Sequence, residues 1–255
     1  MSEVIKEIYC LGVQRAATTS IYEDIAEALD LPHFEVKEKS SLFEGDNIPE
    51  GAYLKSHSGY RKSKYFLDFT PEYSIHLDKI KIPKNAFVFV VLRKPSSRII
   101  SHWKKYRNER KQVTLEEFID NNIDRCVDRS RYSKFLPLLL KDNCKVYFLE
   151  RDLKKLYNDL SRYLGCEIKQ SVKANSSVKI PRFFLPLYRY LAIENAGVQK
   201  VLTIIGFKKL YRLMIRPLFQ ERESIKISNK SLEILNLINQ EEKLALKRNS
   251  LVIPW

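Results

Sequence analysis

Apolar residues follow two patterns along this chain: short, mostly unbroken runs, and longer stretches in which they recur every three or four positions. The first pattern is typical of buried strands, and the second is typical of helices that pack one face. Strands are predicted over Ile8–Leu11, Tyr65–Phe69, Ala86–Leu92 and Lys145–Leu149. Helical spacing lies between them, so the chain predicts parallel strands joined by crossover helices.

Helical spacing begins after the first run and the loop that follows it, where Ile21 and Ile25 share one face. Gly165 is expected to end a later helix, because glycine readily adopts the left-handed conformation found after helices. Further helices are predicted over about 115–126, 131–140, 154–164 and 228–247. The last of these carries an apolar stripe made of Leu232, Leu235, Ile238 and Leu244.

The chain has 255 residues and is 44% hydrophobic, which is enough to bury a substantial core. Alternating strands and helices predict an α/β fold: a single doubly wound domain whose central parallel sheet is flanked by helices. The domain is expected to span 1–255, with 183–255 a mainly helical part packed on it. Its N-terminal strand, loop and helix have the order found in P-loop proteins.

The formal charge of +14 favours polyanionic partners, such as a nucleotide, an anionic polysaccharide, nucleic acid or a membrane surface. The four cysteines form no C-x-x-C pair, so free thiols in a reducing compartment are expected. The four histidines form no ligand cluster, and no metal is expected. Neither a signal peptide nor an apolar stretch of membrane-spanning length is found, so a cytoplasmic location is expected.

The loop after the first strand has the composition of an anion site. Gly12 ends the apolar run, Arg15 adds a positive charge, and Thr18, Thr19 and Ser20 add hydroxyl donors. The hydroxyl residues open the next helix, whose first N–H groups and dipole attract anions. The Walker pattern G-x-x-x-x-G-K-[ST] is absent, so an ordinary capped helix stays open as the alternative.

A second cationic position follows the most apolar strand. Arg93 comes at the carboxyl end of that strand, and Pro95 then begins a helix in which Ser101 lies one to two turns along. Arg93 is therefore expected at the mouth of this strand, close to the start of the helix.

Residues 12–20, G-V-Q-R-A-A-T-T-S, resemble the 5′-phosphosulfate loop of the sulfotransferases, which usually reads G-x-x-K-x-G-T-T-S. These enzymes take a sulfuryl group from 3′-phosphoadenosine-5′-phosphosulfate (PAPS) and release 3′-phosphoadenosine 5′-phosphate (PAP). The resemblance implies donor contacts from Gln14, Arg15, Ala16, Ala17, Thr18, Thr19 and Ser20. Arg15 stands where the family more often has lysine, and Ala17 replaces a glycine, so Ala17 fits only if its φ is negative.

The 3′-phosphate site of the family resembles the second cationic position: a strand, R-x-P, and a serine eight residues after the arginine. Arg93 and Ser101 meet that spacing, and the resemblance implies that they bracket the 3′-phosphate of the donor. The resemblance also implies nucleotide contacts from Tyr132 and from a basic loop in which Lys179 and Arg182 are the candidates. A plain linker is an equally good interpretation of that loop.

Lys37-Glu38, with Phe43 one position later than in the family pattern, resembles the K-E-x-x-x-F segment of carbohydrate-type sulfotransferases, in which the glutamate takes the proton of the acceptor. Glu38 is therefore the first candidate for the catalytic base. Asp68 and His57 are the alternatives, and His57 lies in a segment similar to the K-T-H of cytosolic members.

The resemblance implies in-line sulfuryl transfer from PAPS to a hydroxyl of a small-molecule or polysaccharide acceptor, without a metal. Arg15 is expected to neutralise the charge on the leaving oxygen. The apolar and basic segment 183–219 leaves peripheral membrane contact open. Two rival functions are a P-loop small-molecule or nucleoside kinase and a non-catalytic basic nucleic-acid-binding protein. No nucleic-acid-binding motif is found in the sequence, so nucleic acid is not expected as a partner.

Overall fold

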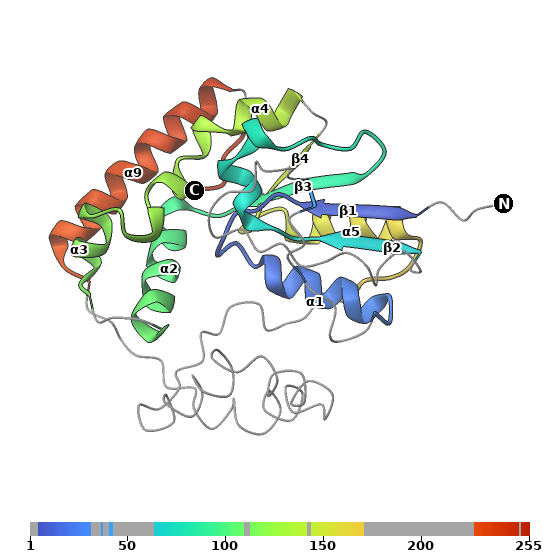
Figure 1. The fold of residues 1–255 in the computed structure, drawn as a ribbon. Helices are drawn as coiled ribbons and strands as arrows, with labels where there is room; N and C mark the ends of the chain where they lie inside the picture. The colour runs from blue at the N-terminus through green and yellow to red at the C-terminus, as the bar shows by residue number, and fades with distance from the viewer. Residues whose placement is uncertain are drawn as a thin grey trace, which may run out of the picture.

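The computed structural model describes residues 5–31, 37, 41–42, 64–109, 113–141, 144–170, 227–249 and 251–255. Within these residues, four parallel strands form one sheet in the order β2-β1-β3-β4 (Figure 1). The predicted α/β class, with a central parallel sheet flanked by helices, is confirmed.

Each predicted strand is present, with slightly shifted ends. The strands are β1 Lys6–Cys10, β2 Tyr65–Asp68, β3 Phe87–Leu92 and β4 Lys145–Phe148. Every residue of β3 is buried, because an inner parallel strand is covered on both faces. β1 lies between β2 and β3, where Tyr9 pairs with Asp68 on one side and with Val88 on the other.

Two helices share the main core with the sheet. They are α1 Thr18–Ala28 and α5 Leu153–Leu164. Ile25 of α1 and Leu160 of α5 are completely buried in this core, and Tyr157 of α5 donates a hydrogen bond to the carboxylate of Asp24 in α1. Gly165 ends α5 with φ 79°, as predicted.

Three helices lie together beyond the end of the sheet where the strands finish (Figure 1). They are α2 Pro95–Glu109, α3 Leu115–Asp120 and α9 Asn229–Arg248. A second apolar cluster joins them, in which Trp103, Phe118 and Leu235 are buried. This cluster holds α2 in place beside the end of β3.

The buried face of α9 differs from the predicted stripe. Leu235 is buried as expected, but Leu232 and Leu244 are 43% and 60% exposed. Polar residues take part in the packing instead: Asn239 accepts a hydrogen bond from the backbone N–H of Ser96 (3.0 Å) and donates one to the Ser96 hydroxyl (2.9 Å).

The predicted helix over 115–126 is interrupted after Asp120. Asn122, Asp124 and Arg125 have φ values of 44°, 51° and 54°, which an α-helix does not contain. Short 3₁₀ helices occupy this region and the turn after β2: η2 Pro71–Ile75, η3 Leu77–Lys79, η4 Ile123–Arg125, η5 Asp128–Ser130 and η6 Tyr132–Lys134. The predicted helix over 131–140 consists of η6 and α4 Leu136–Lys141.

The four cysteine thiols are free, as predicted, and all but that of Cys166 belong to buried residues. No helix in the described part of the chain has both the length and the apolar character needed to cross a membrane.

Candidate functional site

A loop and a strand end meet at the carboxyl edge of the sheet, between β1 and β3. The chain passes from β1 to β2 on one side and later returns to β3 on the other side of β1. Ligands of open α/β sheets bind in the crevice at such a reversal of strand order. The loop between β1 and α1 (residues 11–17) is called the β1 loop. Backbone hydrogen bonds join it to β3, from the Val91 N–H to the Gly12 carbonyl (2.8 Å) and from the Val13 N–H to the Val91 carbonyl (3.0 Å).

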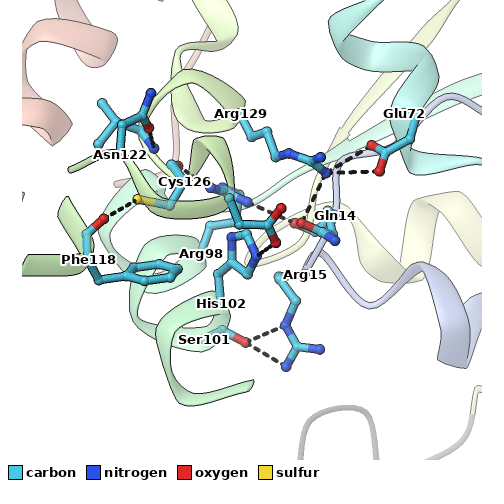
Figure 2. Close-up of polar contacts among 12 residues, drawn as sticks. Gln14, Arg15, Glu72, Arg98, Ser101, His102, Phe118, Asn122, Cys126 and Arg129 are labelled. Carbon is cyan, nitrogen blue, oxygen red and sulfur yellow. Dashed lines mark hydrogen bonds and ion pairs between the residues drawn. The ribbon is translucent and has the colours of Figure 1, made fainter. Parts of the chain in front are cut away.

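Arg15 connects the residues that the sequence placed at this edge. Its Nε and Nη2 donate to the Ser101 hydroxyl at 3.2 and 3.1 Å (Figure 2). Arg93 Nη1 donates to the backbone carbonyl of Arg15 at 3.0 Å. The structure therefore brings together the first loop, the end of β3 and the second turn of α2.

The loop contains left-handed backbone at several positions. Gly12 has φ 128°, and a Cβ there would lie 3.0 Å from Ser74 Oγ and 3.2 Å from the Pro71 carbonyl. Arg15 and Ala17 have φ values of 71° and 61°. The expectation of a negative φ at Ala17 is therefore wrong. The chain enters α1 through the conformation that glycine usually supplies, at a cost of about 1–2 kcal/mol for alanine.

The first turn of α1 lacks a side-chain cap. Ala17 at the N-cap position makes no side-chain hydrogen bond, whereas Thr114 and Ser228 cap α3 and α9. Thr19 is exposed and Ser20 is half-buried in that turn. The N-terminus of α1 thus offers backbone N–H groups and two hydroxyls at its positive end.

Lys37, to which the sequence assigned no role of its own, adds a cation next to the loop. Its Nζ donates to the Thr18 hydroxyl at 3.3 Å, and its carbonyl accepts a hydrogen bond from the Phe69 N–H at 2.9 Å. Lys37 therefore joins the carboxyl end of β2 to the start of α1. The contact between Lys37 and Thr18 joins residues 19 positions apart, so no local sequence pattern reveals it.

Arg98, which no motif singled out, is completely buried behind the loop. Its Nε donates to the Ser130 hydroxyl at 2.7 Å, and its Nη2 donates to the Cys126 carbonyl. Its Nη1 makes a longer contact, 3.5 Å, with the carbonyl of Gln14. Burial lowers the pKa of Arg98 to about 10, so the side chain stays cationic at pH 7.

Tyr132 is completely buried, and its hydroxyl donates to the Arg93 carbonyl at 2.7 Å. Burial raises the pKa of the Tyr132 hydroxyl. Burial also lowers the pKa of Arg93, while the Glu150 carboxylate acts in the opposite direction. Tyr132 thus supports the backbone that carries Arg93, and its predicted contact with a nucleotide stays a prediction.

Asp68 is completely buried, and both carboxylate oxygens accept hydrogen bonds. Oδ2 accepts from the N–H and hydroxyl of Ser41 (2.9 and 2.6 Å) and from the Tyr73 hydroxyl (2.6 Å). Oδ1 accepts from the Thr70 hydroxyl at 2.7 Å. These bonds explain why an acidic residue ends a buried strand, and they favour a structural role for Asp68 over that of a base.

Several predicted positions lie outside the described part of the chain: Glu38, His57, Lys179, Arg182 and the segment 183–219.

Ala16 is described and is completely buried, with its N–H donating to the Val13 carbonyl at 3.2 Å. Ala16 therefore contributes to the shape of the loop. No group of three or more His, Cys, Asp and Glu side chains that would hold a metal ion occurs among the described residues.

No family model matches this sequence, and no curated protein sequence is significantly similar to it. A solved structure of a sulfotransferase from Alicyclobacillus acidocaldarius is similar, with a TM-score of 0.44 and 14% sequence identity. The alignment covers 77% of this chain and 95% of that chain. A likeness at that level has no bearing on activity.

Proposed function

We propose that this protein transfers a sulfuryl group from PAPS to a hydroxyl group of a carbohydrate-type acceptor. The contact of Arg15 with both Ser101 and Arg93 carries the proposal. Arg15 and Ser101 lie 86 positions apart, in the two motifs that resemble the 5′-phosphosulfate loop and the 3′-phosphate site. Cations from both motifs at one sheet edge fit a nucleotide that is negatively charged at two ends.

We assign the 5′-phosphosulfate to the first turn of α1. Helix N–H groups and the helix dipole stabilise an anion at such a position, and no side-chain cap from Ala17 competes for them. Arg15 and Lys37 supply positive charge beside this turn. The hydroxyl of Thr19, an exposed residue, is a further donor.

We assign the 3′-phosphate to Arg93 and Ser101. The Ser101 hydroxyl accepts from Arg15, and a hydroxyl that accepts a hydrogen bond still has its own O–H to donate. The bond from Arg93 to the Arg15 carbonyl uses one of several guanidinium donors. Both side chains therefore have donors suited to a phosphate.

The proposed transfer is in-line and needs no metal. As the S–O bond of the donor breaks, negative charge develops on the phosphate oxygen that leaves with PAP. Arg15 and the N–H groups at Thr18 and Thr19 are the proposed groups that neutralise this charge. They are held in place before reaction, so little reorganisation is needed when the charge appears.

Glu38 is the proposed base that removes the proton of the acceptor hydroxyl. Its neighbour in the chain, Lys37, contacts Thr18 at the start of α1, which supports this choice. The hydrogen bonds accepted by Asp68 make it the weaker candidate. His57 is the alternative base.

A carbohydrate-type acceptor agrees with the overall charge. The formal charge of +14 favours an anionic polysaccharide over a neutral small molecule, although both carry suitable hydroxyl groups.

The proposed location is cytoplasmic. Contact of 183–219 with a membrane surface is an added proposal, and it would bring a lipid-linked acceptor near the site.

A thermal-shift panel tests the donor. PAP should raise the melting temperature by about 5–10 °C at a concentration 100 times its Kd, without magnesium. ATP, GTP and AMP should raise it much less. A shift with ATP that needs magnesium would favour the kinase, and salt-sensitive binding of bare DNA without nucleotide selectivity would favour the nucleic-acid-binding protein.

A further inference from the structure

One nitrogen of Arg129 joins the β1 loop to the turn after β2. Arg129 Nη1 donates to Gln14 Oε1 at 3.2 Å and to the two carboxylate oxygens of Glu72 at 3.2 and 2.9 Å (Figure 2). The side chains of Arg129 and Glu72 are 12% and 26% exposed. Gln14 is on the loop after β1, and Glu72 is in η2, so the contact spans two neighbouring strand ends.

A buried residue holds Arg129 at this place. Arg98, which is completely buried, donates to the hydroxyl of Ser130, the next residue in the chain, and to the carbonyl of Cys126. The Ser130 hydroxyl also donates to the Cys126 carbonyl at 2.9 Å. The turn that carries Arg129 is therefore fixed on α2, the same helix that carries Ser101.

The contact decides which way the Gln14 carboxamide faces. A guanidinium group has donors and no acceptor, so Gln14 presents its oxygen to Arg129. Its NH₂ group then faces away from Arg129. Gln14 is half-buried and directly precedes Arg15, so an oriented NH₂ group there is a donor next to the proposed phosphosulfate site.

We propose that Arg129 is a positioning residue that orients the Gln14 carboxamide so that its NH₂ group donates to the anion bound by the β1 loop. Glu72 balances the charge of Arg129 and holds its Nη1 in place. The orientation of Gln14 does not depend on the identity of the anion. The choice of PAP as that anion rests on the proposed function.

The orientation is tested without any ligand. ¹⁵N relaxation reports the mobility of the Gln14 side-chain amide, whose resonance is assigned by its absence in Gln14→Ala. We expect a rigid amide in the wild type and a mobile one in Arg129→Ala. The matched control is Arg162→Ala, which removes an 81% exposed arginine of α5 and should leave the amide rigid.

Arg129→Ala leaves Glu72 without its guanidinium partner, so a second variant guards against failure to fold. Arg129→Met combined with Glu72→Gln removes both charges and should also free the Gln14 amide. A Gln14 amide that is equally mobile in the wild type and in either folded variant would overturn the proposal, whether or not PAP binds.

Titration with PAP then measures the effect on binding. Gln14→Ala and Arg129→Ala should each weaken PAP binding about tenfold, and the double variant should be no weaker than either single variant, because Arg129 acts through Gln14. Additive losses would overturn that mechanism. If the wild type does not bind PAP, the proposed function fails, and the relaxation result still decides the role of Arg129.

Discussion

Arg15 and Ser101 lie 86 positions apart and are joined by two hydrogen bonds, from Nε at 3.2 Å and from Nη2 at 3.1 Å to the serine hydroxyl. Ser101 stands on α2, which packs beyond the end of β3, and Arg15 stands on the loop after β1. A guanidinium held in this way has lost part of its freedom before any ligand arrives. The loss of entropy on binding an anion is therefore smaller than for a free surface arginine.

Replacement of Arg93 by alanine should weaken PAP binding about 10- to 100-fold, because a hydrogen bond from a charged group contributes about 1.5–3 kcal/mol. The analogue that lacks the 3′-phosphate should lose far less affinity. Calorimetric titration of both ligands checks this, with Arg162→Ala as the matched control. Equal losses for the two ligands would show that the 3′-phosphate is assigned to the wrong residues.

Glu38→Gln should lower turnover about 10²- to 10⁴-fold, which is the usual contribution of a general base, while PAP affinity stays the same. Steady-state transfer of radiolabelled sulfate to a panel of glycans, together with PAP titration, measures both quantities. His57→Gln is the companion variant. Wild-type turnover in Glu38→Gln would remove Glu38 from this role, and loss of turnover in His57→Gln alone would transfer the role to His57.

Ala17→Gly should stabilise the protein by about 0.5–1 kcal/mol. Ala17 has φ 61°, and glycine adopts this conformation without the clash of a Cβ. Ala26→Gly, within α1, should destabilise by a similar amount, since glycine has a low helix propensity. Denaturant unfolding of both variants gives the two values. A loss of stability in Ala17→Gly as large as that in Ala26→Gly would contradict the prediction.

Acid should destabilise the fold through His102. Burial lowers the pKa of His102 below its ordinary value of 6.5, and the charges of Arg98 and Arg129 act in the same direction, against the hydrogen bond to Asp124. His102 Nε2 lies 2.7 Å from Asp124 Oδ2, and Nδ1 is buried without a hydrogen-bond partner among the described residues. The unfolded chain therefore binds the proton more tightly than the folded protein does.

The stability that the neutral His102 side chain contributes is complete above pH 6.5. It is lost as the pH falls toward the pKa of His102 in the folded protein, by up to about 1.4 kcal/mol per pH unit. Urea unfolding of the wild type and of His102→Gln at pH 7 and pH 5 measures the effect. The variant should show the smaller difference between the two pH values. The same pH dependence in both proteins would show that His102 does not titrate as described.

Local sequence pattern determined the strands and much of the site. The unbroken apolar run of β3 indicated a strand buried on both faces, and Gly165 marked the end of α5. The order of strand, loop and helix placed Arg15 just before α1, and the same reasoning placed Arg93 at the end of β3 and Ser101 one to two turns into α2. These features depend on neighbours in the chain, so a single sequence contains them.

Tertiary structure alone decided which polar groups are buried. Arg98 is buried behind the loop, Lys37 reaches Thr18, and Glu242 of α9 accepts two hydrogen bonds of 2.9 Å from Ser133. Helical periodicity predicted instead that Leu232 and Leu244 of α9 are buried, because a periodic pattern reports only the average tendency of apolar side chains to be buried. A charged side chain is buried where partners from distant segments satisfy its hydrogen bonds, and those partners are known only once the chain has folded.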